Sequence, residues 1–232
     1  MIRTVFVHLN VLLATFTLGY SRIVLSIIDR SGDLAHLASR LWGRWILVSS
    51  GVRVRVRGQE HILKDRPQIF FSNHTSYFDV FCLLAHLPAQ FRWLAKVELF
   101  RIPMFGKVMV YGGYIPIDRS NPRAAHRSMT AAAERIRAGT SIVVFPEGAR
   151  SPDGTLQPFK SGGAILAIWA QVPVVPIAIL GTHPVMPKRS LRVTRGKVEI
   201  RIGKPIPTDG MRPRDKGVLL SQAREAIAGL LE

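Results

Sequence analysis

The chain has very little cysteine and few acidic residues. Its only cysteine, Cys82, lies in an apolar stretch, so no intramolecular disulfide can form, which is compatible with a reducing compartment. Only 15 aspartates and glutamates stand against 32 lysines and arginines, and the resulting net charge of +17 indicates a polyanionic partner. Because 47% of the residues are hydrophobic and the mean hydropathy is +0.18, the balance favours an anionic membrane surface over nucleic acid.

Several catalytic signatures are also missing. The chain has no G-x-S-x-G turn that would expose a serine nucleophile. Its histidines show no metal-ligand spacing such as H-E-x-x-H, so we expect no metal site. There is no internal repeat and no low-complexity tract. These absences argue against a serine hydrolase and a zinc enzyme of that type, and the length predicts one domain with an N-terminal appendage.

The N-terminal part is apolar in two stretches. Residues 4–28 are long enough for a membrane span, which needs about 20 apolar residues, but they are interrupted by His8, Asn10 and Arg22. We find no small-residue cleavage site, so we do not expect a removed signal peptide. After a polar turn, residues 34–48 form the second stretch. Four of its residues share one helical face: Leu37, Leu41, Arg44 and Val48.

Two apolar helices joined by a polar turn fit a hairpin that dips into one leaflet, or one span followed by an interfacial helix. A pair of buried core helices is the alternative. We predict that residues 1–50 form a membrane-docking segment and that residues 51–232 form an α/β domain.

From residue 51 on, predicted strands alternate with predicted helices. Asn121 and Pro122 are a typical helix start, since asparagine caps and proline fits the first turn. We expect strands at 52–57, 68–72, 91–95, 114–117, 141–145 and 173–179, and two more within 191–202 folded about Arg195-Gly196. We expect helices at 78–87, 102–110, 122–137 and 161–170, and an amphipathic C-terminal helix. The alternation predicts a mostly parallel central sheet flanked by helices, with active-site loops at strand ends.

The most informative motif is NHTSYFD, residues 73–79, directly after an apolar segment. The pKa of histidine lies near neutrality, so His74 could accept a proton from an alcohol if a carboxylate fixed its tautomer. Ser76 with Asp79 three residues later resembles a capping box, which would place Asp79 in the first helical turn, facing His74. The alternative is that Asp79 only stabilises the helix start and His74 is an ordinary turn residue.

Polar residues end three further predicted strands. GGYIPIDR (112–119) ends with Arg119, and FPEGARS (145–151) contains Glu147, Gly148 and Arg150. Arginine matches phosphate oxygens with two parallel hydrogen bonds, and glycine lets the backbone approach a ligand closely. Lys96 follows the strand at 91–95, and VPVVPI (172–177) is a proline-bounded strand. The alternative for each cluster is a solvated loop with surface charges.

The four motifs NHTSYFD, GGYIPIDR, FPEGARS and VPVVPI, in this order, resemble the glycerophospholipid acyltransferase family, and its 1-acylglycerol-3-phosphate (lysophosphatidic acid) acyltransferase branch most. The resemblance covers roughly residues 52–207, and the apolar N-terminal pair resembles the membrane-docking helices of the family. It implies that His74 is the base and Asp79 its orienter. It also implies glycerophosphate-binding roles for Arg119, Glu147 and Arg150.

Gly148 matches the turn glycine of the third motif, and Ala149 departs from the family pattern, since many members have threonine there. We add Lys96 as a substrate-binding candidate because of its strand-end position. The resemblance implies transfer of an acyl group from an acyl thioester to the sn-2 hydroxyl of the lysolipid, giving phosphatidic acid. Acyl-CoA or an acyl carrier protein would be the co-substrate, with no metal or redox cofactor, at the cytoplasmic face of the cell membrane.

Three other functions stay open at this stage. The acceptor could be another lysolipid, such as a lyso-ornithine lipid. A hydrolase is the second alternative, although Ser76 and Ser151 lack the strand-turn context of a serine nucleophile. The third is a non-enzymatic basic module that binds membranes or nucleic acid. We expect no nucleic-acid partner, because base-stacking aromatics are not interleaved with the cations.

Overall fold

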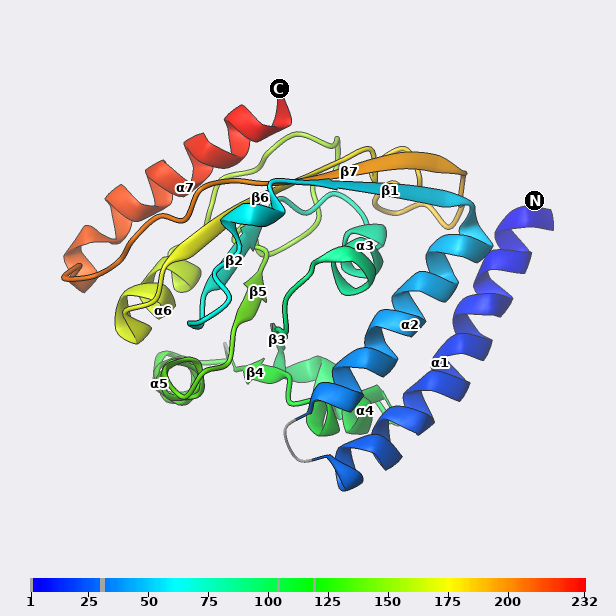
Figure 1. The fold of residues 1–232 in the computed structure, drawn as a ribbon, viewed down its shortest axis with the longest axis horizontal. Coiled ribbons are helices and arrows are strands. Elements are labelled where there is room, and N and C mark those ends of the chain that lie inside the picture. Colours follow the sequence, from blue (N-terminus) through cyan, green and yellow to red (C-terminus); the bar gives the residue numbers. More distant parts are fainter. Residues whose placement is uncertain (1, 30–31, 104, 119) are drawn as a thin grey trace.

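The computed structural model describes residues 2–29, 32–103, 105–118 and 120–232, without the side chains of residues 20, 22, 26 and 27. Its centre is a seven-stranded sheet in the order β1-β7-β6-β2-β5-β3-β4 (Figure 1). The strands are β1 (Val52–Arg57), β2 (Ile69–Ser72), β3 (Arg92–Lys96), β4 (Ile115–Ile117), β5 (Ile142–Val144), β6 (Val174–Leu180) and β7 (Gly196–Ile202). All neighbours run parallel except β6 and β7. The predicted mostly parallel sheet is therefore confirmed.

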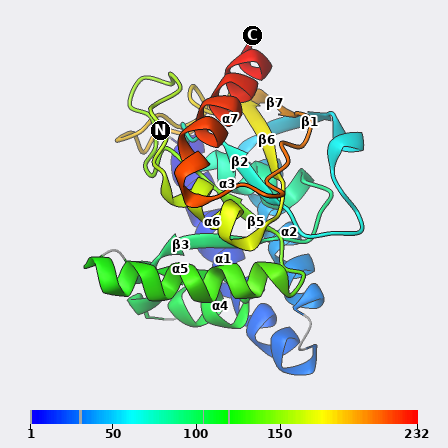
Figure 2. The same ribbon diagram turned by 90° about the vertical axis from the view of Figure 1, so that its left-hand side faces the viewer.

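Helices cover both faces of this sheet, as the two views in Figures 1 and 2 show. One face carries α1 (Ile2–Ile28), α2 (Asp33–Ser50), α3 (Phe78–His86) and α4 (Phe105–Tyr111). The other carries α5 (Pro122–Arg137), α6 (Gly162–Ala170) and α7 (Lys216–Leu231). Short 3₁₀ turns lie at Gln59–His61, Val97–Arg101 and Pro213–Asp215. Each face has its own hydrophobic core, because a buried strand points alternate side chains to opposite faces.

Local sequence signals explain several of these elements. The Asn121 side chain accepts a hydrogen bond from the backbone N–H of Ala124 at 2.8 Å, and Pro122 follows it, so α5 begins where predicted. In α7 the predicted apolar face packs on the sheet, with Leu219, Ala223 and Ile227 fully buried. The short strand β5 is buried on both faces, in keeping with its unbroken apolar sequence.

Two predicted elements differ from the structure. The predicted strand at 191–195 is wrong: both edges of β7 are already occupied, by β1 and β6, so no third strand can pair with it. Residues 193 and 194 bond instead to α1 and to the loop after β6, through Thr4 and Val185. The predicted helix at 102–110 is α4, Phe105–Tyr111, and Ile102 and Pro103 lie outside it, because a residue that precedes proline disfavours helical geometry.

The predicted apolar helix pair is present, and the polar turn predicted to join the two helices contains residues 30 and 31, which lie outside the described residues. α1 and α2 run side by side and pack through inward residues such as Val7, Ile46 and Leu47. Their outer residues, including Leu37, Leu41 and Val48, are exposed. α1 is long and apolar enough over Ile2–Leu25 to cross a membrane, and only 17% of that window is buried, unlike a core helix. α2 ends at Ser50, next to the predicted boundary, and the division into two parts stays a prediction.

Candidate active site

His74 and Asp79 are in contact. The imidazole Nδ1 lies 2.8 Å from Oδ2 of Asp79, which is fully buried in the first turn of α3. A carboxylate can only accept, so Nδ1 carries the proton and Nε2 is left with a free lone pair. The imidazole also stacks on Phe145, with ring centroids 3.9 Å apart. These contacts hold the ring in one orientation and one tautomer.

The Asp79 carboxylate accepts hydrogen bonds from several donors. The backbone N–H groups of Thr75 and Ser76 donate to Oδ2 at 2.7 and 2.9 Å, beside the imidazole. The Thr182 hydroxyl donates to Oδ1, and the Thr75 hydroxyl therefore donates to Thr182 at 2.9 Å. This set of donors satisfies a buried negative charge, which would otherwise be very unfavourable.

The predicted capping arrangement is only partly present. α3 begins at Phe78, and its cap residue Tyr77 makes no side-chain cap bond. The Ser76 hydroxyl accepts the N–H of Phe78 and donates to the Met186 carbonyl at 2.9 Å. The Ser151 hydroxyl donates to Asp153. Both serine hydroxyls are thus engaged away from His74, in line with their predicted lack of a nucleophile's context.

Glu147 lies behind the His74 main chain. Its Oε1 accepts the backbone N–H of His74 at 2.7 Å, and its Oε2 accepts that of Gln157 at 3.2 Å. The residue is only 5% exposed, and this burial raises the pKa of its carboxyl from 4.5 to about 7, against the lowering effect of the two N–H groups. The charge of Asp79 raises it further. Glu147 therefore fixes the backbone that carries the histidine.

The turn after β5 completes this wall of the site. The N–H of Gly148 donates to the Phe145 carbonyl at 3.0 Å, and Gly148 has a φ of 76°, where other residues are strained. A Cβ at this position would also meet the Lys160 side chain at 3.0 Å. The N–H of Ser151 donates to the His74 carbonyl at 2.7 Å, which ties this turn to the histidine turn.

A cavity of about 670 Å³ leads from His74 to the helix pair. Its walls are mostly apolar and come from α1, α2, α3, β3, α4 and the loops after β5 and β6. Representative lining residues are Val11, Ala38, Trp42, Phe81, Trp93 and Phe105. An apolar cavity with a few polar groups at one end suits an amphiphilic substrate.

Of the predicted substrate-binding residues, some line this cavity and one lies beside it. Lys96 lines it from the end of β3, and so do Gly148 and Ala149. Arg150 lies beside its rim, with its guanidinium carbon 3.6 Å above the ring of Tyr77, which is itself a lining residue. Arg119 lies outside the described residues.

Sequence reasoning missed two residues of the site. Thr182 was not singled out, although it follows the predicted strand 173–179 and polar residues at such strand ends are candidates. Lys188 donates from Nζ to the Arg150 carbonyl at 2.6 Å and so links the loop after β6 to the loop after β5. No sequence signal marks this contact, because Lys188 is one cation among many.

The arrangement defines a class of protein: an α/β fold in which an imidazole, oriented by a buried carboxylate and able to accept a proton, lies at the end of an apolar cavity. Among the residues that the structure describes, no group of three His, Cys, Asp or Glu side chains could hold a metal ion. A general base of this kind can deprotonate an alcohol presented at the mouth of the cavity.

Comparison with known proteins agrees with this class. The family model described as Acyltransferase matches residues 53–180. The 1-acyl-sn-glycerol-3-phosphate acyltransferase BAT2, chloroplastic, of Brassica napus is 35% identical over 173 residues, covering 74% of this chain and 50% of the relative. The alpha form from Homo sapiens is 34% identical over 178 residues, covering 76% of this chain and 63% of the relative.

A solved structure extends the similarity to the whole fold. The 1-acyl-sn-glycerophosphate (LPA) acyltransferase PlsC from Thermotoga maritima superimposes with a TM-score of 0.77 at 28% identity, covering 97% of this chain and 94% of that chain. The chain belongs to the acyltransferase family, because the family model spans more than half of it. It spans about half the length of the chloroplast relative BAT2.

Proposed function

We propose that this protein transfers a fatty acyl group from an acyl thioester to the sn-2 hydroxyl of 1-acylglycerol-3-phosphate, giving phosphatidic acid. The observation that carries the proposal is the His74–Asp79 pair at the end of the apolar cavity. The names of the sequence relatives and of the structural neighbour, which are all acyltransferases of this substrate class, support it.

In this reaction Nε2 of His74 accepts the proton of the acceptor hydroxyl as that oxygen attacks the thioester carbonyl. Asp79 holds the ring and stabilises the imidazolium that forms, so that the substrate alcohol takes the place of the serine in a catalytic triad. The proton then leaves with the thiol as the tetrahedral intermediate collapses. General-base action of this kind contributes about 10²–10⁴-fold in rate.

The two ends of the acceptor would meet different parts of the site. The cavity supports binding of the acyl chain, since its lining is mostly aliphatic and aromatic. Arg150, Lys96 and Arg119 are the proposed partners of the phosphate, and Lys188 keeps the Arg150 loop in place through its bond to the carbonyl. Gly148 would admit the ligand close to the backbone. Glu147 would act from behind, by holding the His74 backbone.

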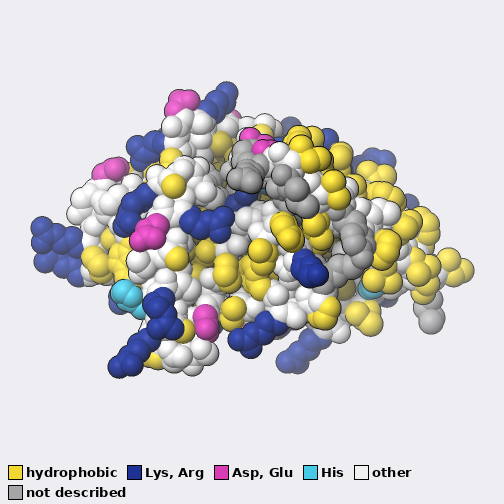
Figure 3. Space-filling model, turned by 90° about the horizontal axis from the view of Figure 1, so that it is seen from below, with side chains coloured by type: hydrophobic (Ala, Val, Ile, Leu, Met, Phe, Trp, Pro, Cys, Tyr) yellow, Lys and Arg dark blue, Asp and Glu magenta, His cyan; other side chains and the backbone are white. Residues whose placement is uncertain are grey.

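We propose that the outer faces of α1 and α2 attach the protein to the cytoplasmic face of the cell membrane. Exposed apolar side chains on these helices include Val5, Phe6, Leu12, Phe16 and Leu37. Figure 3 shows hydrophobic side chains gathered at the right-hand end, where α1 lies, with Lys and Arg side chains near them. A group of exposed apolar side chains on a basic protein fits an anionic bilayer.

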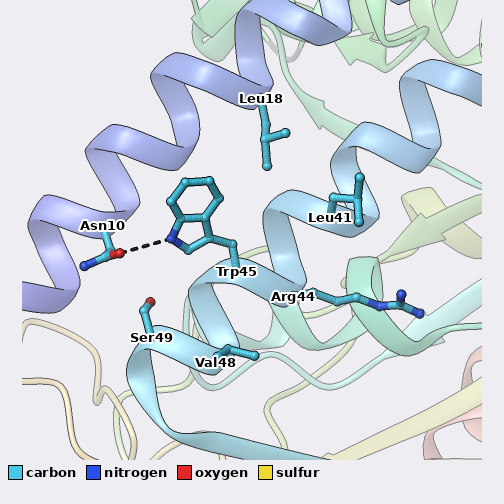
Figure 4. A pocket seen from close by; sticks show the side chains of 7 residues that line it. All are labelled: Asn10, Leu18, Leu41, Arg44, Trp45, Val48 and Ser49. Carbon is cyan, nitrogen blue, oxygen red and sulfur yellow. Dashed lines mark hydrogen bonds between the residues drawn. The ribbon is translucent and has the colours of Figure 1, made fainter.

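The groove between the two helices supports the same placement. Leu18, Leu41 and Val48 line it, and the indole N–H of Trp45 donates to the Asn10 side chain at 3.0 Å (Figure 4). Tryptophan with an apolar ring and a satisfied polar edge is typical of a membrane–water interface. Arg44 stands at the border of the groove, where its charge could reach lipid head groups.

The test is a panel of acceptors and donors with mass-spectrometric identification of the products. Lysophosphatidic acid, other lysophospholipids and a lyso-ornithine lipid would each be offered with acyl-CoA and with acylated carrier protein. We expect phosphatidic acid from lysophosphatidic acid, and the donor used fastest identifies the co-substrate. Transfer only to another lysolipid would move the assignment to that acceptor.

The His74→Ala variant is the control for this panel. We expect a folded, membrane-bound protein with almost no acyl transfer, and near-normal turnover would reject His74 as the base. Thiol release measured without any lysolipid tests the hydrolase alternative. Release that does not depend on the acceptor would favour a thioesterase.

A further inference from the structure

The loop between β6 and β7 exposes a leucine within a run of cations. Leu191 is 73% exposed, and the exposed arginines Arg189, Arg192 and Arg195 lie around it in the sequence. No acidic residue occurs from Gly181 to Val198. An exposed large apolar side chain inside a purely cationic segment has no role in the α/β core, and it matches the chemistry of an anionic lipid surface.

This segment, residues 187–195, which we call the leucine loop, is hydrogen-bonded to α1 and to the chain just before it. The N–H of Val193 donates to the Thr4 hydroxyl of α1 at 3.3 Å, and the Thr194 hydroxyl donates to the Pro184 carbonyl at 2.7 Å. Arg189 has a φ of 66°, a left-handed conformation that is strained for arginine. The loop therefore presents Leu191 to the outside at some conformational cost.

The leucine loop also lies at the edge of the cavity. Leu191 and Val193 line it together with Val7, His8 and Val11 of α1. Figures 1 and 2 both show the gold-coloured segment between β6 and β7 beside the N-terminal end of α1. The exposed side chains of Ile2, Val5 and Phe6 belong to that same end of α1, so their apolar surface and Leu191 flank one side of the cavity.

We propose that the leucine loop is a second membrane-contact element, separate from the helix pair, which inserts Leu191 into an anionic bilayer. Arg189, Arg192 and Arg195 bind lipid phosphates around it. Contact at this point places the part of the cavity that Leu191 and α1 line at the level of the lipid, so that a lysolipid can move from the bilayer into the cavity. The lipid passage rests on the proposed function, whereas the insertion of the loop does not.

Insertion is tested by a fluorescent label at a single cysteine. Cys82 is fully buried and burial raises the pKa of its thiol, so a Leu191→Cys variant offers one reactive site for a nitrobenzoxadiazole dye. The unsubstituted chain, treated in the same way, gives the labelling background. The variants would be mixed with vesicles of phosphatidylcholine containing 30 mol% phosphatidylglycerol, as a chosen probe composition.

Two exposed positions serve as matched controls. Leu9→Cys on α1, 59% exposed in the native protein, reports insertion of the helix pair, and Val218→Cys on α7, 57% exposed, lies on the other side of the sheet. We expect a blue shift and a rise in emission at positions 191 and 9, and none at 218. A label at 191 that behaves like the one at 218 while position 9 responds would overturn the proposal.

The charges are tested by the double variant R192Q/R195Q, with K216Q/R224Q on α7 as a control of equal charge loss. Sedimentation with the same vesicles should show binding about 5- to 30-fold weaker for the loop variant, from a contribution of about fivefold per cation, and little change for the control. Equal weakening in both variants would assign the effect to net charge alone and overturn a local role. A second result would also overturn the proposal: vesicle binding by the loop variant stays unchanged, and only its turnover of acylated carrier protein falls. The arginines would then bind a protein partner rather than lipid. Neither readout depends on which lysolipid is the acceptor.

Discussion

The two sides of the sheet are both apolar, but they differ in the size of their side chains and in how these side chains pack. On the side of α5, α6 and α7, small residues let the helices lie close to the strands, and the missing side chain of Gly163 leaves only the space that the Phe71 ring fills, 2.8 Å from where a Cβ would be. On the side of α1, α2, α3 and α4, large aromatic residues surround a cavity of about 670 Å³. One side, which we call the closed side, is a core of packed side chains, and on the other, the open side, the core surrounds a cavity.

The difference shows how this fold separates stability from function. The closed side can stabilise the sheet through ordinary packing, because its hydrophobic side chains meet one another. The open side keeps apolar surface available for a ligand, and the His74–Asp79 pair lies at the end of that surface. Substitutions on the two sides should therefore have different effects, and four predictions test this, beginning with the one that has the largest expected effect.

Asp79→Asn, on the open side, should lower kcat by about 10²–10⁴-fold. The amide would present an N–H₂ group to at least one of the donors that now face the carboxylate, and the imidazole would lose its fixed tautomer. Steady-state kinetics gives the value, and circular dichroism checks that the fold is retained. A variant with wild-type kcat would mean that the orientation of His74 does not depend on this carboxylate.

Arg150→Ala should raise the KM for the phosphorylated acceptor by about 10- to 100-fold, with a smaller change in kcat. This factor corresponds to the free energy of a hydrogen bond to a charged group. Arg224→Ala on α7 removes the same charge from the closed side and is the control. An equal rise in both variants would indicate general attraction of the anionic substrate. An unchanged KM at Arg150 would remove it from the phosphate site.

The same substitution on each side compares the two directly. Ala133→Leu in α5 adds bulk to the closed core and should lower the free energy of unfolding by about 1–3 kcal/mol. Ala38 in α2 lines the cavity, so Ala38→Leu should lower the free energy of unfolding much less than Ala133→Leu does. The added side chain should instead reduce the turnover of the longest acyl donors. Denaturant unfolding and a donor series measure both. Equal destabilisation would mean that the cavity is not available space.

Glu147→Gln should give the smallest effect, on the pH dependence of stability. The pKa of Glu147 is raised from 4.5 to about 7 in the folded protein, so the folded state binds more protons than the unfolded state between these values. The free energy of unfolding of the native protein should therefore fall as pH rises through this window. Glutamine does not titrate, so the variant should not lose this stability as the pH rises. Between pH 4.5 and pH 8 its free energy of unfolding should therefore increase by on the order of 1 kcal/mol relative to that of the native protein, after allowance for screening.

Urea unfolding of both proteins at pH 4.5, 6 and 8 measures this difference. The loss of the Gln157 N–H bond to the second carboxylate oxygen affects the variant at every pH, so only the change of the difference with pH is diagnostic. A difference that stays constant across the range would show that burial does not hold the carboxyl in its neutral form.

Much of the architecture could be predicted from local patterns. The alternation of strands and helices indicated the mostly parallel sheet, and Asn121 with Pro122 indicated where α5 begins. The contact between His74 and Asp79 was also predictable, because five residues of a strand-turn-helix leave few ways to separate them. Their catalytic roles, and those of Lys96, Arg119, Glu147 and Arg150, stay predictions.

Other features depend on contacts between distant parts of the chain. Thr182 completes the hydrogen bonds of Asp79 from 103 residues away, and the conformation of residues 191–195 follows from the strands that already flank β7. Neither has a local pattern that would announce it.

Composition and local patterns were enough to predict the basic charge, most of the helices and strands and the histidine–aspartate turn, because none of these requires knowing which distant residues meet. The packed fold was needed to show that Glu147 lies behind the histidine, that a cavity stays open beneath the helix pair, and that Leu191 lies at its edge. The physical reason is that a cavity is made by side chains that do not meet, and which side chains meet is settled only when all the layers pack together.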